Sequence, residues 1–241
     1  METRTALVTG AAQGLGQEFA VALAGCGYRV AGLDLVPQPE TADRIPDYLE
    51  LVGDVADEEV IGAGLERVVD RFGTLHVVVN NAGVYPAKPF EETTPEEWRR
   101  VMRVNLEGPY LVTRAALPHL KAAGWGRVVN IASAAVFTAP PTMVPYVASK
   151  MGLIGFTRAL AAALAPYAIT VNAIAPTMVR TATAERTVGA DGGFAFVRDR
   201  QAVRRTQEPS DLVSTLLYVV DEGSGFLTGQ TLNVSGGSAY L

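Results

Sequence analysis

The stretch Thr9-Gly10-Ala11-Ala12-Gln13-Gly14-Leu15-Gly16 follows a short apolar run, Thr5 to Val8, and precedes an amphipathic pattern through Leu23. This order predicts a strand, a glycine-rich turn and a helix. Gly10 permits the tight turn, Gly14 lets the backbone approach a phosphate, and Gly16 permits close packing of the helix. Free N–H groups and the helix dipole would face that anion. The stretch therefore predicts a dinucleotide-binding turn at the start of an α/β domain.

An acidic residue ends the second predicted strand, Arg29 to Leu33. Asp34 lies within the range of about 20 residues past the glycines at which a carboxylate binds the adenosine ribose. It would accept hydrogen bonds from the ribose hydroxyls and repel a 2′-phosphate. A strand-end cap is the alternative role, which the preceding turn disfavours. Gln13 and Leu35 occupy positions where a 2′-phosphate would need a cation, and neither residue is basic. We therefore expect NAD rather than NADP as the cofactor.

Strand and helix patterns alternate along the rest of the chain. Further strands are expected at 48–52, 75–79, 127–131, 169–174 and near 231–234, and helices at 57–72, 94–120, 147–164 and 210–220. Asn80-Asn81-Ala82-Gly83 follows a strand, where small residues let the backbone approach a ligand. Thr94 and Glu97 predict a capping box. Asn105 falls in mid-helix, where it costs stability and therefore invites a functional reason.

The stretch Tyr146-Val147-Ala148-Ser149-Lys150 carries the clearest chemical pattern. On a helix, positions i and i+4 share one face, so Tyr146 and Lys150 would project together. An ammonium near a phenol favours the phenolate, so we expect the pKa of Tyr146 to fall below its ordinary value of about 10. Such a tyrosine can take a proton from an alcohol or give one to a ketone oxygen. A surface pair that happens to be four residues apart is the alternative.

Composition limits the classes of protein that fit. The 241 residues suit one α/β domain, and 49% hydrophobic residues with a mean hydropathy of +0.19 suit a sheet buried on both faces. A formal charge of −5 disfavours nucleic acid as a partner. The short N-terminus and the polar breaks within 159–176 argue against a signal peptide and a membrane span, so we expect a cytoplasmic protein.

Cysteine and histidine offer little further chemistry. The single cysteine, Cys26, excludes an intrachain disulfide and is expected to be small and buried; a catalytic thiol would need a basic partner. His76 and His119 lie at a strand start and a helix end, and no metal site is expected. The polar, glycine-broken stretch at about 181–206 is a candidate substrate lid within the single domain 1–241.

The chain resembles the short-chain dehydrogenase/reductase family over essentially its whole length. The resemblance rests on the order of its motifs, which are the glycine-rich turn, Asn80-Asn81-Ala82-Gly83, Asn105, Ser133, the Tyr146/Lys150 pair and Pro176. The resemblance implies a doubly wound, Rossmann-type sheet of seven parallel strands, a bound nicotinamide dinucleotide and a homotetramer built partly on the helices of Asn105 and Tyr146.

The resemblance also assigns roles to single residues. Tyr146 would be the acid/base, Lys150 would bind the nicotinamide ribose and lower the tyrosine pKa, Ser133 would bind the substrate oxygen, and Asn105 would hold a relay water. Asp54 and Val55 would contact the adenine, and Asn81, Ala82 and Gly83 the adenosine side. Thr181 and the backbone of Thr177 and Val179 would contact the nicotinamide amide. The expected cofactor-binding set is Gly10, Gln13, Gly14, Leu15, Gly16, Asp34, Asp54, Val55, Asn81, Ala82, Gly83, Tyr146, Lys150, Pro176, Thr177, Val179 and Thr181.

Thr177 stands where family members usually carry glycine after the proline. Several loops, among them Asp34 to Pro37 and 172–183, are similar to those of the NAD-dependent (S)-1-phenylethanol dehydrogenases, a branch that acts on aryl ketones and secondary alcohols. We therefore expect hydride transfer between NAD(H) and a hydrophobic or aryl secondary alcohol or ketone. The alternatives are a 3-oxoacyl-(acyl-carrier-protein) reductase, which usually uses NADPH, and a non-catalytic dinucleotide-binding protein.

Overall fold

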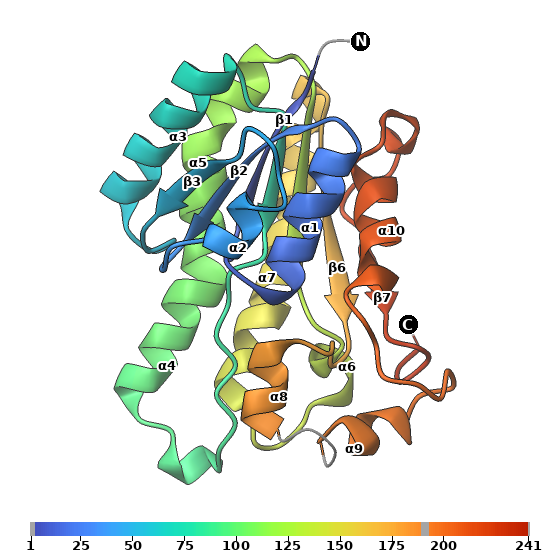
Figure 1. Cartoon of the computed structure of the whole chain (residues 1–241). Coiled ribbons are helices and arrows are strands. Elements are labelled where there is room, and N and C mark those ends of the chain that lie inside the picture. The colour runs from blue at the N-terminus through green and yellow to red at the C-terminus, as the bar shows by residue number, and fades with distance from the viewer. Residues whose placement is uncertain (1–2, 189–192, 241) are drawn as a thin grey trace.

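A computed structural model describes residues 3–188 and 193–240 of the chain. Its centre is a sheet of seven parallel strands in the order β3-β2-β1-β4-β5-β6-β7 (Figure 1). The strands are β1 (Thr5–Thr9), β2 (Arg29–Asp34), β3 (Leu49–Val52), β4 (Val77–Asn80), β5 (Gly126–Ile131), β6 (Ile169–Pro176) and β7 (Thr231–Val234). The strand order reverses between β1 and β4, and ligands of open α/β sheets bind at such a reversal. The expected doubly wound sheet is thus confirmed.

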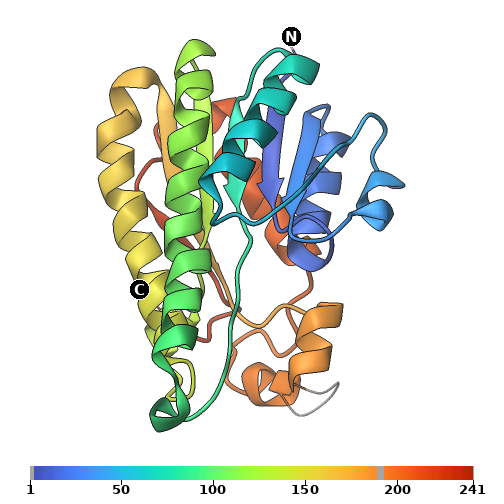
Figure 2. The same ribbon diagram turned by 90° about the vertical axis from the view of Figure 1, so that its left-hand side faces the viewer.

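Helices cover both faces of the sheet. They are α1 (Gly14–Gly25), α2 (Pro39–Ala42), α3 (Glu58–Phe72), α4 (Pro95–Met102), α5 (Gly108–Ala122), α6 (Ala135–Thr138), α7 (Val144–Leu164), α8 (Ala182–Val188), α9 (Phe194–Arg198) and α10 (Ser210–Val220). Shorter turns are η1 (Phe90–Glu92), η2 (Arg103–Glu107), η3 (Ala165–Tyr167) and η5 (Glu222–Ser224). Figure 2 shows α5 and α7 side by side across one face, with α3 beside them.

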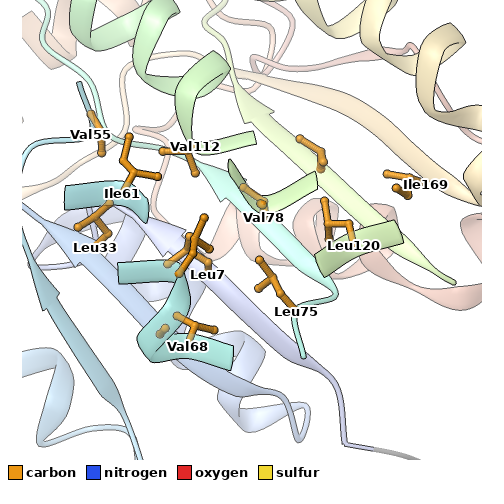
Figure 3. Close-up of a cluster of buried hydrophobic side chains, with 14 of the residues drawn as sticks. Leu7, Leu33, Val55, Ile61, Val68, Leu75, Val78, Val112, Leu120 and Ile169 are labelled. Atoms are coloured by element: carbon orange, nitrogen blue, oxygen red, sulfur yellow. The ribbon is translucent and has the colours of Figure 1, made fainter. Parts of the chain in front are cut away.

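Alternate residues of β1 fill two separate cores, one on each face of the sheet. Leu7 belongs to the core beneath α3, α5 and α7, whereas its neighbours Ala6 and Val8 belong to the core beneath α1 and α10. Figure 3 shows the first of these cores, in which Leu7 and Val78 lie among side chains from the covering helices. Because helices cover both faces of the sheet, the strand sequences are continuous apolar runs and do not alternate between apolar and polar residues.

A ladder of buried polar side chains ties the middle of the sheet to its helices. Asn80 Nδ2 lies 3.0 Å from Thr113 Oγ1 and 2.8 Å from Asn130 Oδ1, and Asn130 Nδ2 lies 2.9 Å from Thr157 Oγ1. Buried amides need such partners, since an unpaired one costs about 1–3 kcal/mol. The ladder fixes β4 and β5 against α5 and against α7, the helix that carries Tyr146 and Lys150.

Some sequence expectations differ from the structure. The helix expected over 94–120 has its capping box at Thr94, but it is divided into α4, the π turn η2 and α5, with Asn105 inside the π turn. Cys26 is exposed rather than buried, because it is the C-cap of α1 and lies beyond the last core residue of that helix, Leu23.

One helical stretch, Val144–Tyr167, has the length and apolar composition of a membrane span. A core helix of a globular domain can have the same length and composition. This stretch is α7 with η3, and α7 packs against β6 and η2 and carries both Tyr146 and Lys150.

Candidate active site

The Tyr146/Lys150 pair lies on α7 beside the carboxyl ends of β4, β5 and β6. Lys150 Nζ donates a hydrogen bond to the backbone oxygen of Ile131, the last residue of β5, at 2.6 Å. The same Nζ lies 5.9 Å from the centroid of the Tyr146 ring. The two side chains therefore share one helix face, as their spacing predicts, and that face is turned toward the edge where the strand order reverses.

Lys150 is almost completely enclosed, with 4% of its surface exposed. Burial lowers the pKa of its ammonium to about 8, because a charge loses its hydration in the protein interior. The lysine is thus held by the Ile131 carbonyl while its proton is less tightly bound than usual. Such a group can take part in proton transfer near neutral pH.

Tyr146 behaves differently from the expectation. Burial raises the pKa of its phenol above 10, and the Ser133 hydroxyl, which interacts with the phenol, offsets this only in part. The expected lowering of this pKa is therefore wrong for the chain alone: desolvation of the phenolate has the largest effect, and the lowering that opposes it comes from Ser133 rather than from Lys150. The ring of Tyr85 meets that of Tyr146 edge to face, with centroids 6.3 Å apart. The phenol thus lies between Ser133 and an aromatic wall.

Ser133 lies just past β5 and is 8% exposed. Its Oγ accepts a hydrogen bond from Ala135 N at 3.1 Å, which leaves the hydroxyl proton for another acceptor. The next residue, Ala134, donates its backbone N–H to the oxygen of Pro176 at 2.8 Å. Ser133 is therefore held at the point where the ends of β5 and β6 meet, facing Tyr146.

Asn105 lies in the π turn η2 and has no exposed surface. Its Oδ1 accepts from Val84 N at 2.8 Å, and its Nδ2 donates to Val84 O at 2.8 Å and to Ser149 Oγ at 3.1 Å. Both Nδ2 hydrogens are used, so only one lone pair of Oδ1 remains for a water. A Cβ on Gly83 would lie 3.3 Å from that Oδ1 and 3.6 Å from Lys150 Nζ. The glycine therefore leaves room between the two groups.

Ser149 is a residue of the site that the sequence argument missed. It is fully buried, accepts from Asn105 and donates its hydroxyl to the backbone oxygen of Tyr146 at 2.7 Å. A serine inside an apolar helix, next to Lys150, was the available signal, because mid-helix serines usually bond to the backbone. Ser149 joins the π turn to the helix turn that carries Tyr146.

The glycine-rich turn forms a cradle at the start of α1. Gly10 has φ +69°, and a Cβ on Gly16 would clash with the Gly10 carbonyl oxygen. The N-cap, Gln13, makes no side-chain capping bond, and the first turn of α1 has no acidic residue. The N–H groups at this helix end are therefore free for an anion, and the residues fit the pyrophosphate of a dinucleotide.

Asp34 lies directly beside this turn. Its Oδ2 accepts from Ala12 N at 2.9 Å and its Oδ1 from Val36 N at 3.3 Å. Each carboxylate oxygen retains lone pairs for a further donor. The structure thus places a carboxylate with free lone pairs next to the glycines.

Of the other residues expected on the adenosine side, Asn81 and Ala82 lie at the same turn, whereas Asp54 and Val55 follow β3. Asn81 Nδ2 donates to Thr9 O at 2.9 Å and to Gly10 O at 3.2 Å, while Ala82 N donates to Thr9 Oγ1 at 3.0 Å. Asp54 follows β3 and accepts from Ala56 N at 2.9 Å, and Val55 is buried in the core beneath α3. The side chain of Asn81 is therefore engaged in holding the glycine turn to the end of β4.

The residues expected beside the nicotinamide follow β6. Thr177 N donates to Gln207 Oε1 at 3.0 Å, so the Thr177 backbone can offer a cofactor only its carbonyl oxygen. Thr181 Oγ1 accepts from Ala184 N at 3.1 Å, and a Cβ on Gly14 would lie 3.2 Å from Thr181 Cγ2. The loop after β6 thus reaches back to the glycine-rich turn.

The expected lid, 181–206, contains α8 and α9, which Figure 1 places beyond the tip of β6. Residues 189–192 lie outside the described part of the chain. Arg186 Nη2 lies 3.4 Å from Gln13 Oε1, an arginine near the turn that the sequence argument missed because 173 positions separate the two residues. Within 3–188 and 193–240, no three His, Cys, Asp or Glu side chains gather in a way that could hold a metal ion.

Comparisons with known proteins agree with this geometry. A family model described as "Enoyl-(Acyl carrier protein) reductase" matches residues 10–239. The (2S)-[(R)-hydroxy(phenyl)methyl]succinyl-CoA dehydrogenase subunit BbsD of Thauera aromatica is 34% identical over 100% of this chain and 98% of its own. The trans-4-hydroxycyclohexanecarboxylate dehydrogenase of Sinomonas cyclohexanicum is 36% identical over 97% of this chain and 92% of its own.

A solved structure shows the same fold. The 3-ketoacyl-(acyl-carrier-protein) reductase of Brucella melitensis, complexed with NADH, superposes with a TM-score of 0.92 at 30% identity over 99% of each chain. The chain belongs to the short-chain dehydrogenase/reductase family. It is an oxidoreductase of that family, whose Rossmann-type fold binds a nicotinamide dinucleotide.

Proposed function

We propose that the chain transfers a hydride between NAD(H) and a secondary alcohol or ketone with a hydrophobic or aryl substituent. One observation carries the proposal: the phenol of Tyr146 lies against Ser133, on the helix face that also holds Lys150, at the sheet edge that follows the glycine-rich turn. An acid/base group, an oxyanion donor and a dinucleotide cradle are the parts that carbonyl reduction needs.

Each residue has a distinct part in that chemistry. NAD(H), when bound, gives or accepts the hydride. In the direction of reduction, Tyr146 gives its proton to the ketone oxygen while the Ser133 hydroxyl donates a hydrogen bond to the developing negative charge. Lys150, whose pKa is lowered to about 8, can return a proton toward the phenol. Asn105 Oδ1 and the space at Gly83 offer a water next to Lys150.

Asp34 supports NAD rather than NADP as the preferred cofactor. Its carboxylate touches the glycine-rich turn through Ala12 N, where a 2′-phosphate would add a second negative charge. Arg186 is the basic side chain that reaches Gln13, at 3.4 Å, but it is exposed and also bonded to Thr183 Oγ1. A solvated arginine offsets the repulsion by the half-buried Asp34 carboxylate poorly, because exposed charges interact weakly.

A ring-bearing secondary alcohol is the substrate class with most support. Tyr85 stacks edge to face on Tyr146 and places an aromatic wall beside the acid/base group. The two relatives described above are dehydrogenases whose names give substrates that carry a phenyl or a cyclohexane group. The loop likeness to aryl alcohol dehydrogenases points the same way.

A 3-oxoacyl-(acyl-carrier-protein) reductase is the second candidate. The Brucella melitensis protein described above is a 3-ketoacyl-(acyl-carrier-protein) reductase complexed with NADH, so use of NADH does not by itself decide between the two activities. The non-catalytic alternative is disfavoured, since a pure binder has no need of the phenol, the buried lysine and Ser133 together.

We also propose that the chain forms a homotetramer. A surface groove of about 660 Å³ runs along α4, η2 and α5 to Phe156 of α7, and the large side chains of Trp98 and Tyr110 on it are exposed. An apolar groove on the helices that carry Asn105 and Tyr146 suits contact with a second copy. Light scattering after size exclusion measures the assembly.

Cofactor-resolved turnover tests the proposed activity. Purified protein is given acetophenone or a 3-oxoacyl thioester, each with NADH or NADPH, and loss of the reduced cofactor is followed. Ketone reduction with NADH and little with NADPH is expected. Faster turnover of the thioester than of the ketone would replace the first candidate by the second, and dependence on NADPH would overturn the role of Asp34.

A further inference from the structure

Gln207 is a buried glutamine that joins the nicotinamide-facing loop to the last strand. It is 6% exposed, its Oε1 accepts from Thr177 N at 3.0 Å, and its Nε2 donates to Val234 O at 2.7 Å. Thr177 follows β6 directly and Val234 ends β7. The side chain therefore spans the two neighbouring strands at their carboxyl ends.

The register of the sheet shows what this amide replaces. β6 and β7 are parallel, with Ala173 opposite Thr231 and Pro176 opposite Val234, and Ala173 N donates to Gln230 O at 2.8 Å. In a parallel ladder the donors of one strand recur at every second residue. Continued by that rule, the ladder would place a bond from Thr177 N directly to Val234 O. The Gln207 carboxamide stands between these two groups and bonds to both.

The backbone around Gln207 holds the same loop. Val179 and Gln207 form an isolated parallel bridge, and Arg180 N donates to Gln207 O at 2.8 Å. Arg180 also forms an ion pair with Glu208, with 3.0 Å between Nε and Oε1. The loop from Thr177 to Arg180 thus leaves β7 and pairs with the segment around Gln207.

We propose that Gln207 is a positioning residue for the nicotinamide half of the cofactor. Its carboxamide interrupts the β6–β7 ladder after Pro176 and sets the path of the backbone that follows. This inference rests on the proposed function, in which Val179 and Thr181 contact the nicotinamide amide. Without the Gln207 carboxamide, Thr177 N loses its acceptor, and either the loop shifts toward Val234 or two buried polar groups are left unpaired.

Comparing NADH with ADP-ribose tests the proposal, because ADP-ribose lacks the nicotinamide. Calorimetric titration of the Gln207→Met variant, which keeps the side-chain length without the amide, should show an NADH Kd about tenfold higher, the effect of one or two lost hydrogen bonds. The ADP-ribose Kd should change by less than about twofold. The exposed Gln230→Met variant is the matched control and should leave both Kd values unchanged.

The Gln207→Glu variant adds a readout that general destabilisation would not give. A protonated glutamic acid can accept from Thr177 N and donate to Val234 O as glutamine does, whereas the carboxylate cannot donate. Its NADH Kd should therefore approach the wild-type value at about pH 5.5 and rise at about pH 8, since burial raises a carboxyl pKa. This variant also serves if Gln207→Met does not fold.

Three results would overturn the proposal. In Gln207→Met, these are an equal loss of affinity for NADH and ADP-ribose, or no loss of either. In Gln207→Glu, it is a pair of affinities that follow the wild-type pH profile. A failure of the proposed function can be told apart, because the wild-type chain itself would then fail to reduce the ketone with NADH. If that chain uses NADPH only, the same comparison is made with NADPH and 2′-phospho-ADP-ribose, and the role of Gln207 is still decided.

Discussion

Asn105 Nδ2 lies 3.1 Å from Ser149 Oγ, and this hydrogen bond joins the π turn η2 to the helix that carries the acid/base tyrosine. Ser149 in turn donates to the backbone oxygen of Tyr146 at 2.7 Å. The position of Tyr146 therefore depends on a side chain 41 residues earlier in the chain. Asn105 also holds Val84, so one amide connects α7, the π turn and the loop after β4.

Replacing Asn105 should destabilise the fold as well as the site. Asn105→Ala leaves the N–H and carbonyl of Val84 and the hydroxyl of Ser149 without this partner, and we expect the free energy of unfolding to fall by about 3 kcal/mol. Ser149→Ala removes two hydrogen bonds, the one from Asn105 Nδ2 and the one to the backbone oxygen of Tyr146, and should lower it by about 2 kcal/mol. Urea unfolding measures both variants. A loss in Asn105→Ala no larger than that in Ser149→Ala would contradict this assignment.

Asp34→Asn should relax the preference for NADH. The amide keeps an oxygen for Ala12 N and removes the charge that would repel a 2′-phosphate. A change of about 1.4 kcal/mol in that repulsion corresponds to about a tenfold rise in the ratio of kcat/KM for NADPH over NADH. Initial rates at varied cofactor concentration give this ratio.

Asp54→Asn is the matched control for the cofactor preference. Asp54 also follows a strand of the sheet, but it accepts from Ala56 N and is expected on the adenine side. The variant can weaken both cofactors and should leave their ratio unchanged. A similar shift of the ratio in both variants would show that general negative charge, rather than the position of Asp34, sets the preference.

Burial of Lys150 should make the stability of the cofactor-free protein depend on pH. Its folded pKa is about 8, whereas an unfolded lysine has about 10.4. Between these values the unfolded chain binds more protons, so stability rises with pH, by up to about 3 kcal/mol; below pH 8 both states are protonated and the contribution is constant.

The difference in unfolding free energy between wild type and Lys150→Met isolates this effect. It should be flat from about pH 6.5 to 7.5 and should shift in favour of wild type from about pH 8 to 10. Higher pH is avoided because the pKa of Tyr146 is raised, so the unfolded tyrosine loses its proton first and stability falls again. Lys121→Met, at an exposed lysine over the Tyr167 ring, should show no such slope. A slope of the opposite sign for Lys150→Met would mean that the lysine is held charged.

The sequence predicted those features that depend on near neighbours in the chain. The turn from Gly10 to Gly16 and the shared face of Tyr146 and Lys150 follow from spacings of a few residues, which backbone geometry converts directly into positions. Strand order followed from the resemblance, since the alternation of strands and helices alone allows several orders.

Long-range side-chain pairs could not be predicted in this way. Thr177 and Gln207 are 30 residues apart, and their hydrogen bond depends on how far β6 and β7 continue together. The prediction for the pKa of Tyr146 was wrong for a related reason. The nearby lysine is visible in the sequence, but the burial that raises this pKa is set by the packing of the whole fold.

Tyr146→Phe is the most direct test of the central claim that this phenol moves the proton during hydride transfer. The substitution removes one hydroxyl from a ring that packs against Tyr85, so the fold and the NADH Kd should change little. The turnover number for ketone reduction with NADH should fall by about 10²–10⁴, the typical contribution of a positioned acid/base group. Unchanged turnover, with NADH still bound, would contradict the mechanism.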